Sequence, residues 1–159
     1  MSLTDNSASS GNEADAQRRA EQITVSMRAN DAFSRWLGLE VESIAPARCV
    51  CRMTVRDEMV NGFGVAHGGI VFSFADSAFA FACNTHGTVT VAIDNTITYP
   101  RAIRPGDELR AVAEEESASN RIGYYKVDVR NQRDEIVALF RGTAYRTSRP
   151  HPNDDTTNA

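Results

Sequence analysis

A single carboxylate inside an apolar helix constrains this chain more than any other feature of its sequence. Residues 67–82 read HGGIVFSFADSAFAFA, so two glycines open the segment and Asp76 lies about two turns inside it. A buried charge without a partner is strongly disfavoured, so a carboxylate among Phe, Ala, Ile and Val is either well satisfied or used in chemistry. We interpret Asp76 as a functional group.

A narrow stripe of small and polar residues follows one face of this helix. Gly69 and Asp76 are seven residues apart, which places them on the same side. Further members recur at spacings of three and four, and they are Ser73, Ser77, Ala80 and Asn84. The other faces are apolar, so the pattern predicts a helix over about 68–84 that other structure surrounds. The stripe is expected to face a cavity or a partner subunit.

Composition argues against several classes of function. The 159 residues are 42% hydrophobic and 24% charged, with a net charge of −4, which is typical of a globular domain and argues against a nucleic-acid partner. No apolar run reaches the length of a membrane span and no signal peptide is recognisable, so we expect a soluble cytoplasmic protein without a membrane partner.

The cysteines lack zinc-like spacing, so no metal site is expected; they are Cys49, Cys51 and Cys83.

The order of apolar patterns predicts one α+β domain. Residues 1–13 and 148–159 are polar without periodic apolar positions, so both are expected to be disordered around a domain spanning 14–147. Helices are predicted over 14–29 and 31–37, with Asp31 as N-cap and Gly38 at the end of the second. Strands are predicted over 39–55 in two pieces, 88–99, 107–117, 121–130 and 135–146. An antiparallel sheet curled around one central helix satisfies this order.

The start of the central helix offers hydrogen-bond donors for an oxyanion. The first N–H groups of a helix lack intrahelical partners, and glycines let a ligand approach them closely. Such donors together with a desolvated carboxylate suit attack on a carbonyl, where removing one donor typically costs about 3 kcal/mol of barrier. The sequence shows no Ser–His pair, and a thiolate with a conjugate-acid pKa of about 8.5 leaves with little protonation. A thioester is therefore the simplest substrate.

These motifs resemble the PaaI-type acyl-CoA thioesterases of the hotdog superfamily over about residues 30–147. The matching segments are MVNG at 59–62, HGG at 67–69, ADSAFA at 75–80, ACN at 82–84, PGD at 105–107 and VALFRG at 137–142. The resemblance implies a five-stranded sheet around a long helix, assembled as a homodimer and usually a homotetramer. It also implies hydrolysis of acyl-CoA, typically aryl-acetyl thioesters from phenylacetate breakdown. Coenzyme A belongs to the substrate, and no separate cofactor is implied.

By position, the resemblance assigns the acidic catalytic residue to Asp76 and the oxyanion donor to Gly68, contributed by two different chains. Asn61 and His67 take supporting polar positions, although either could instead serve only to shape its turn. Further substrate contacts are expected from Gly69 and Ser77, and from two arginines as cations for the CoA phosphates, Arg101 and Arg121.

Other functions remain open at this stage. A non-catalytic acyl-CoA-binding module of the same fold would bind its ligand without releasing a thiol. A hotdog hydratase or dehydratase would act on the acyl chain, but that chemistry normally needs a His beside an acid over the acyl group, and His67 in its turn suits this poorly. The sequence also leaves open whether Asp76 attacks the thioester directly or activates water.

Overall fold

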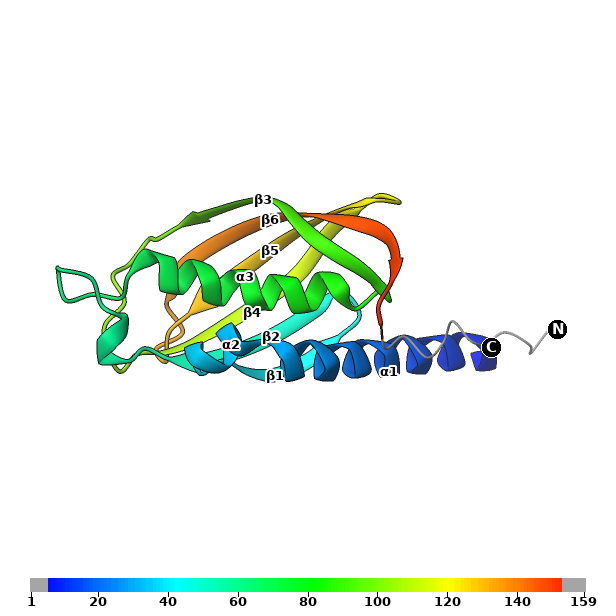
Figure 1. Ribbon diagram of the computed structural model, residues 1–159, viewed down its shortest axis with the longest axis horizontal. Helices are drawn as coiled ribbons and strands as arrows, with labels where there is room; N and C mark the ends of the chain where they lie inside the picture. The colour runs from blue at the N-terminus through cyan, green and yellow to red at the C-terminus, as the bar shows by residue number, and fades with distance from the viewer. Residues whose placement is uncertain (1–5, 153–159) are drawn as a thin grey trace.

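One long helix lies across the concave face of a curved sheet (Figure 1). The structure is a computed structural model that describes residues 6–152, with side chains from Gly11 onward. The predicted α+β class and the central helix are confirmed. In chain order the elements are α1 (Asn6–Asn30), α2 (Ala32–Leu37), β1 (Glu40–Ala45), β2 (Arg48–Thr54), the 3₁₀ turn η1 (Asp57–Met59), α3 (Gly68–Asn84), β3 (Thr88–Thr98), β4 (Glu108–Ala118), β5 (Ile122–Arg130) and β6 (Ile136–Pro150).

The sheet has six antiparallel strands in the order β1-β2-β4-β5-β6-β3, rather than the five predicted. The segment read as one strand in two pieces is a hairpin, in which Glu40 pairs with Arg52 and Ala45 with Arg48. Ala47 adopts a left-handed backbone at the turn, with φ of 61°. The chain therefore reverses direction at Pro46–Ala47, and the two predicted pieces are separate, paired strands. β3 lies at one edge of the sheet.

Aromatic packing fixes α3 against the sheet. Phe74, Phe79 and Phe81 of the helix are all fully buried. The Phe79 ring contacts Tyr125 of β5 edge-on, with centroids 5.3 Å apart, and Phe140 of β6 at 5.7 Å. Each such side chain contributes on the order of 1.5–3 kcal/mol by burial. The expectation that other structure surrounds the apolar faces of this helix is confirmed.

The N-terminal helix is longer than the sequence predicted. α1 begins at Asn6, so residues 6–13 are helical where disorder was expected, while residues 1–5 lie outside the described part. The second half of α1 packs on the sheet through buried Ala20 and Ile23, and Gln17 donates to the Ile44 carbonyl at 2.9 Å. Once these turns are anchored, further turns add a hydrogen bond per residue at little nucleation cost.

The last strand also passes its predicted end. β6 continues to Pro150, which pairs with Thr88, so residues 148–150 of the expected tail belong to the sheet. Residues 153–159 of that tail lie outside the described part. Both predicted caps of α2 are confirmed: Asp31 Oδ1 accepts from Ser34 N at 2.9 Å, and Gly38 is left-handed. Over residues 6–152, no helix is both long and apolar enough to cross a membrane.

Gly142→Ala is expected to lower the free energy of unfolding by about 1–3 kcal/mol, because overpacking a dense core costs energy of this order. A Cβ at this position would lie 2.9 Å from Cζ of Phe79 and 3.0 Å from Cε1 of Phe140, and both rings are fully buried. Chemical denaturation measures the change. Gly62→Ala is the matched control, since a Cβ there meets no atom within 4 Å. Equal stability of the two variants would contradict this packing argument.

Candidate active site

Asp76 lies on α3 and its carboxylate turns toward the edge strand β3. The side chain is half-buried, and its Oδ1 accepts a hydrogen bond of 2.8 Å from the Asn95 amide. Burial raises the pKa of Asp76 above its ordinary value, and the hydrogen bond from Asn95 partly opposes that rise. A carboxylate with a raised pKa is better suited to accept a proton than an ordinary surface aspartate.

The start of α3 distinguishes the two glycines. His67 is the N-cap, and its Nδ1 accepts from the Gly69 N–H at 3.0 Å. The Gly68 N–H has no hydrogen-bond partner among residues 6–152. A substrate contact from the Gly69 N–H would have to displace His67, whereas the Gly68 N–H is free to donate. The geometry therefore supports Gly68, the position predicted as the oxyanion donor, and leaves the substrate contact predicted from Gly69 without a free N–H.

Tyr99, just beyond β3, braces the same helix start. Its hydroxyl donates to the Gly68 carbonyl at 2.7 Å, and a Cβ added at Gly68 would lie 3.2 Å from that oxygen. The Gly68 peptide is thus held from one side by the strand and from the other by the capped helix. A peptide held in this way offers an oriented donor, which is what stabilisation of a developing oxyanion requires.

Asn61 shapes the turn before α3. Its Oδ1 accepts from Phe63 N at 2.9 Å, and its backbone N–H donates to the Val65 carbonyl at 2.8 Å. The turn holds the Phe63 side chain 93% exposed. This geometry supports the structural reading of Asn61, while its side-chain Nδ2 makes no hydrogen bond to any residue between 6 and 152. A contact from Nδ2 to substrate stays a prediction.

The other predicted substrate contacts are not brought to Asp76. Ser77 points to α2, where its hydroxyl lies 3.4 Å from Ser34 Oγ. Arg101 lies 4.0 Å from Glu135, at the end of the sheet near Gly68. Arg121 donates to the Tyr145 hydroxyl at 2.9 Å, at the opposite end. Ten residues of extended chain separate the two arginine partners, a span of about 30 Å. One protomer therefore cannot place both guanidinium groups on the same phosphate.

Helix geometry separates the proposed donor from the acid. Gly68 and Asp76 are eight residues apart on α3, which is about 12 Å along the axis. A reacting carbonyl needs its attacking group and its oxyanion donor each about 3 Å away. The two groups of one protomer therefore cannot act on one carbonyl, and a site that uses both requires a second chain.

The edge strand β3 is suited to meet such a chain. It spans eleven residues, and Val91 and Ile93 are 43% and 57% exposed. A long exposed edge with apolar side chains is a site where another strand can add. Because β3 also carries Asn95, a chain that pairs there would lie beside Asp76.

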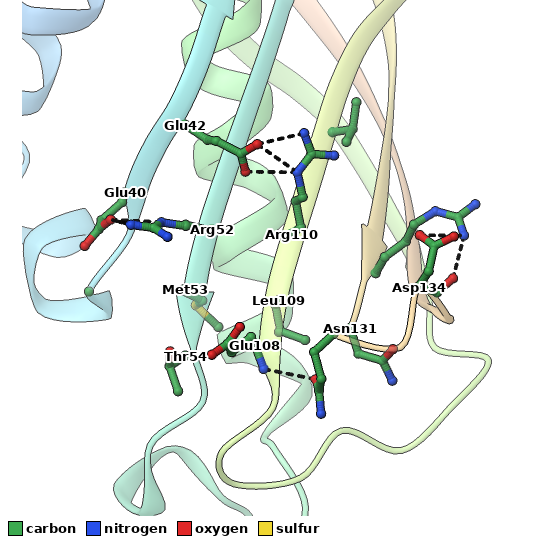
Figure 2. Close-up of a pocket in the computed structure, with 14 residues that line it drawn as sticks. Glu40, Glu42, Arg52, Met53, Thr54, Glu108, Leu109, Arg110, Asn131 and Asp134 are labelled. Atoms are coloured by element: carbon green, nitrogen blue, oxygen red, sulfur yellow. Dashed lines mark hydrogen bonds and ion pairs between the residues drawn. The ribbon is translucent and has the colours of Figure 1, made fainter.

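A surface hollow of about 580 Å³ lies away from these groups, on β1, β2, β4 and the β5–β6 turn (Figure 2). Its arginines are paired with carboxylates: Arg52 bonds Glu40, and Arg110 forms a forked pair with Glu42. None of the predicted site residues lines it. Because Arg52 and Arg110 are already paired with carboxylates, they are poorly suited to bind the phosphates of CoA.

Sequence reasoning missed Asn95 and Tyr99. One signal was available: along β3 the positions 95, 97 and 99 share one face, and Asn95 stands there with Ile97 and Tyr99. An amide at an otherwise apolar or aromatic position of a strand needs a partner. Nothing in the sequence itself indicated that the partner would be Asp76, nineteen residues earlier.

Comparison with known proteins gives consistent results. The family model of the thioesterase superfamily matches residues 63–138. Acyl-coenzyme A thioesterase PaaI of Escherichia coli is 40% identical over 128 residues, covering 80% of this chain and 91% of the relative. Human acyl-coenzyme A thioesterase 13 is 30% identical over 133 residues, covering 81% and 94%. The solved structure of the E. coli PaaI protein superposes with a TM-score of 0.83 at 38% identity, covering 85% of this chain and 98% of that one.

The chain therefore belongs to the thioesterase superfamily, an enzyme family of thioester hydrolases, and has the hotdog fold. The resemblance to PaaI-type proteins expected from the motifs is confirmed.

Asp76→Asn is expected to raise the free energy of unfolding at neutral pH, because it removes a carboxylate that burial penalises. The native pKa of Asp76 lies above the ordinary value of 3.8, so the native state keeps its proton to higher pH than the unfolded state does. Relative to low pH, where Asp76 is protonated in both states, the free energy of unfolding falls as the pH rises from the pKa of Asp76 in the unfolded chain to its higher pKa in the native chain. Thermal unfolding over a pH series measures the difference. An advantage of the variant that is the same at every pH would contradict this assignment.

Proposed function

We propose that this chain hydrolyses acyl-CoA thioesters to a free acid and CoA, with the Asp76 carboxylate as the catalytic base or nucleophile and Gly68 as the oxyanion donor. The observation that carries the proposal is the half-buried Asp76 carboxylate, which has a raised pKa and a single amide partner among residues 6–152. The names of the E. coli and human relatives, both acyl-coenzyme A thioesterases, support the choice of substrate class.

The proposed site is shared between two copies of the chain. Antiparallel pairing along β3 would continue the sheet, cover Val91 and Ile93, and bring Gly68 of one copy toward Asp76 of the other. This removes the separation of about 12 Å that a single helix imposes. We propose a homodimer as the smallest active unit, with a homotetramer as the further assembly that the family resemblance implies.

In the proposed reaction, the thioester carbonyl oxygen accepts a hydrogen bond from the Gly68 N–H. Asp76 either takes a proton from a water molecule that attacks the carbonyl carbon, or attacks that carbon itself to form a mixed anhydride that water then cleaves. In both routes the tetrahedral intermediate collapses by breaking the carbon–sulfur bond, which gives the free acid in the first route and the anhydride in the second, and the CoA thiolate leaves with little need for an acid. CoA enters with the substrate, so the proposal includes no cofactor. His67 and Asn61 hold the turn that presents Gly68.

We propose an aryl-acetyl group, such as phenylacetyl or hydroxyphenylacetyl, as the acyl part. Support comes from the E. coli structure, whose protein is described as part of the phenylacetic acid degradation operon. The three free thiols fit a reducing cytoplasm. A panel of aryl-acetyl, benzoyl and straight-chain CoA thioesters distinguishes the acyl classes by kcat/KM.

Asp76→Ala and Asp76→Asn are both expected to lower turnover by at least about 100-fold, the usual scale for losing a base. Release of free thiol from acyl-CoA measures this. Asp128→Asn on β5 is the control, a carboxylate in the sheet that the proposal does not use. Near-normal turnover in both Asp76 variants would remove this residue from the mechanism.

The same assay tests the two other functions. A binding module would hold acyl-CoA without thiol release even in the wild-type chain, and a hydratase or dehydratase would change the absorbance of an enoyl thioester.

Gly68→Pro is expected to lower kcat by about 100-fold or more while the protein stays folded. Proline is well tolerated at the first position of a helix, and it removes the N–H proposed to bind the oxyanion. It also adds a Cβ that lies 3.2 Å from the Tyr99 hydroxyl, a contact that alanine at the same position reproduces. His67 already has the extended backbone that a following proline favours, with φ of −62° and ψ of 131°. Gly68→Ala keeps the N–H and is the matched control, with a smaller loss expected.

Co-refolding Asp76→Ala chains with Gly68→Pro chains tests the shared site. Each mixed dimer would hold one site with both groups intact, so activity should return to about a quarter of the wild-type value. A mixture as inactive as its two components would contradict a site built from two chains.

A further inference from the structure

Two partly or fully buried asparagines differ in how their amides are satisfied. Asn84, at the end of α3, uses both ends of its side chain: Nδ2 donates to the carbonyls of Ala80 and Thr90, and Oδ1 accepts from Thr90 N. Asn95 uses one end only, because Nδ2 donates to Asp76 while its buried Oδ1 has no partner among the described residues.

A buried acceptor without a partner costs stability, since it has lost its bonds to water and gained none in the protein. An apolar side chain of the same size would avoid this cost on β3, where Ile97 occupies the next position on the same face. The amide therefore does not serve the stability of the strand. Its one bond goes to the carboxylate of the proposed catalytic residue.

We propose that Asn95 is a positioning residue for Asp76. Its Nδ2–H binds Oδ1 of the carboxylate, which fixes the rotation of the group and leaves Oδ2 as the oxygen that meets the water or thioester. A neutral donor also favours the ionised form without the full charge of a lysine or arginine, which would weaken the carboxylate as a base. This inference rests on the catalytic role proposed for Asp76.

The surroundings of Asp76 leave this task to Asn95. Burial and the Asn95 hydrogen bond are the two influences on the pKa of Asp76. On α3, burial raises the pKa of the Cys83 thiol to about 12, and the nearby Asp76 carboxylate contributes to the rise. Elements packed around α3 carry other charged groups, among them Arg28, Glu115 and Arg146, and none of these forms a hydrogen bond or an ion pair with Asp76 within residues 6–152.

The test compares Asn95→Leu and Asn95→Asp with the wild-type chain by the pH dependence of kcat/KM. The Leu variant keeps the approximate size and removes the donor, so the acid limb should move up by about one pH unit and kcat should fall by about 10-fold. The Asp variant keeps the shape and places a second carboxyl beside Asp76, so its acid limb should move higher still. This order of the three limbs is the expected result.

Asn84→Ala and Thr96→Ala are the controls, a satisfied buried amide and the exposed neighbour of Asn95 on β3. Both should leave the acid limb in place, and Asn84→Ala should lower the melting temperature. If the Leu variant does not fold, the shift of the acid limb in the Asp variant alone decides the test. An acid limb that stays in place in the folded Asn95 variants would overturn the inference. If Asp76→Ala is inactive in the same assay, the proposed function stands; if it is active, the proposed function itself fails.

Discussion

The burial of α3 in the concave face of the sheet is the constraint on which the rest of the molecule depends. A helix with apolar residues on nearly every side must be surrounded, and the sheet curves around it through contacts such as Phe79 with Tyr125 and Phe140. Any polar group on that helix is then drawn out of water. Asp76 is half-buried for this reason, and its raised pKa is a consequence of the packing rather than of a nearby charge.

The same helix also limits what one chain can do. A straight helix presents its free N–H groups at one end only, and Asp76 lies more than two turns away from them. The exposed edge of β3 offers a way to bring donor and acid together from two copies. In the proposed dimer, the strand that joins the copies also carries the amide that holds the acid, so assembly and catalysis would share one element.

Much of this arrangement could be predicted from local patterns. Short stretches of sequence predict the bounds of α3 and the two caps of α2, and the structure has both. They also mark Asp76 as the one carboxylate in an apolar helix, and in the structure it is not among the fully buried residues of α3. The β1–β2 hairpin was missed because its turn uses Pro46 and a left-handed Ala47, rather than the Asn-Gly or Gly pairs that mark such turns. The start of α1 was missed because polar residues carry no periodic signal.

The candidate site was harder to predict where contacts are long-range. The family resemblance assigned the oxyanion donor to Gly68 and a further substrate contact to Gly69, but the residues alone gave no physical reason to separate them; the His67 ring, by engaging the Gly69 N–H, supplies one. The bond from Asn95 to Asp76 depends on how β3 lies over α3, which no local pattern specifies. Arg101 and Arg121 lie at opposite ends of the sheet, beside Glu135 and Tyr145. Both were predicted to bind CoA because they lie near the later strands in sequence, but that position does not say at which end of a strand a residue lies.

Asn95 on β3 and Tyr99 just after it hold the strand in one fixed alignment with α3. The four residue steps from Asn95 to Tyr99 span about 13 Å of extended chain, close to the rise of about 12 Å between Asp76 and Gly68, the two residues that they contact. A slip of β3 by one position would turn both side chains to the opposite face at once. Misalignment of this strand would therefore release the carboxylate and the helix start together, leaving no half-assembled state in which one is held and the other is loose.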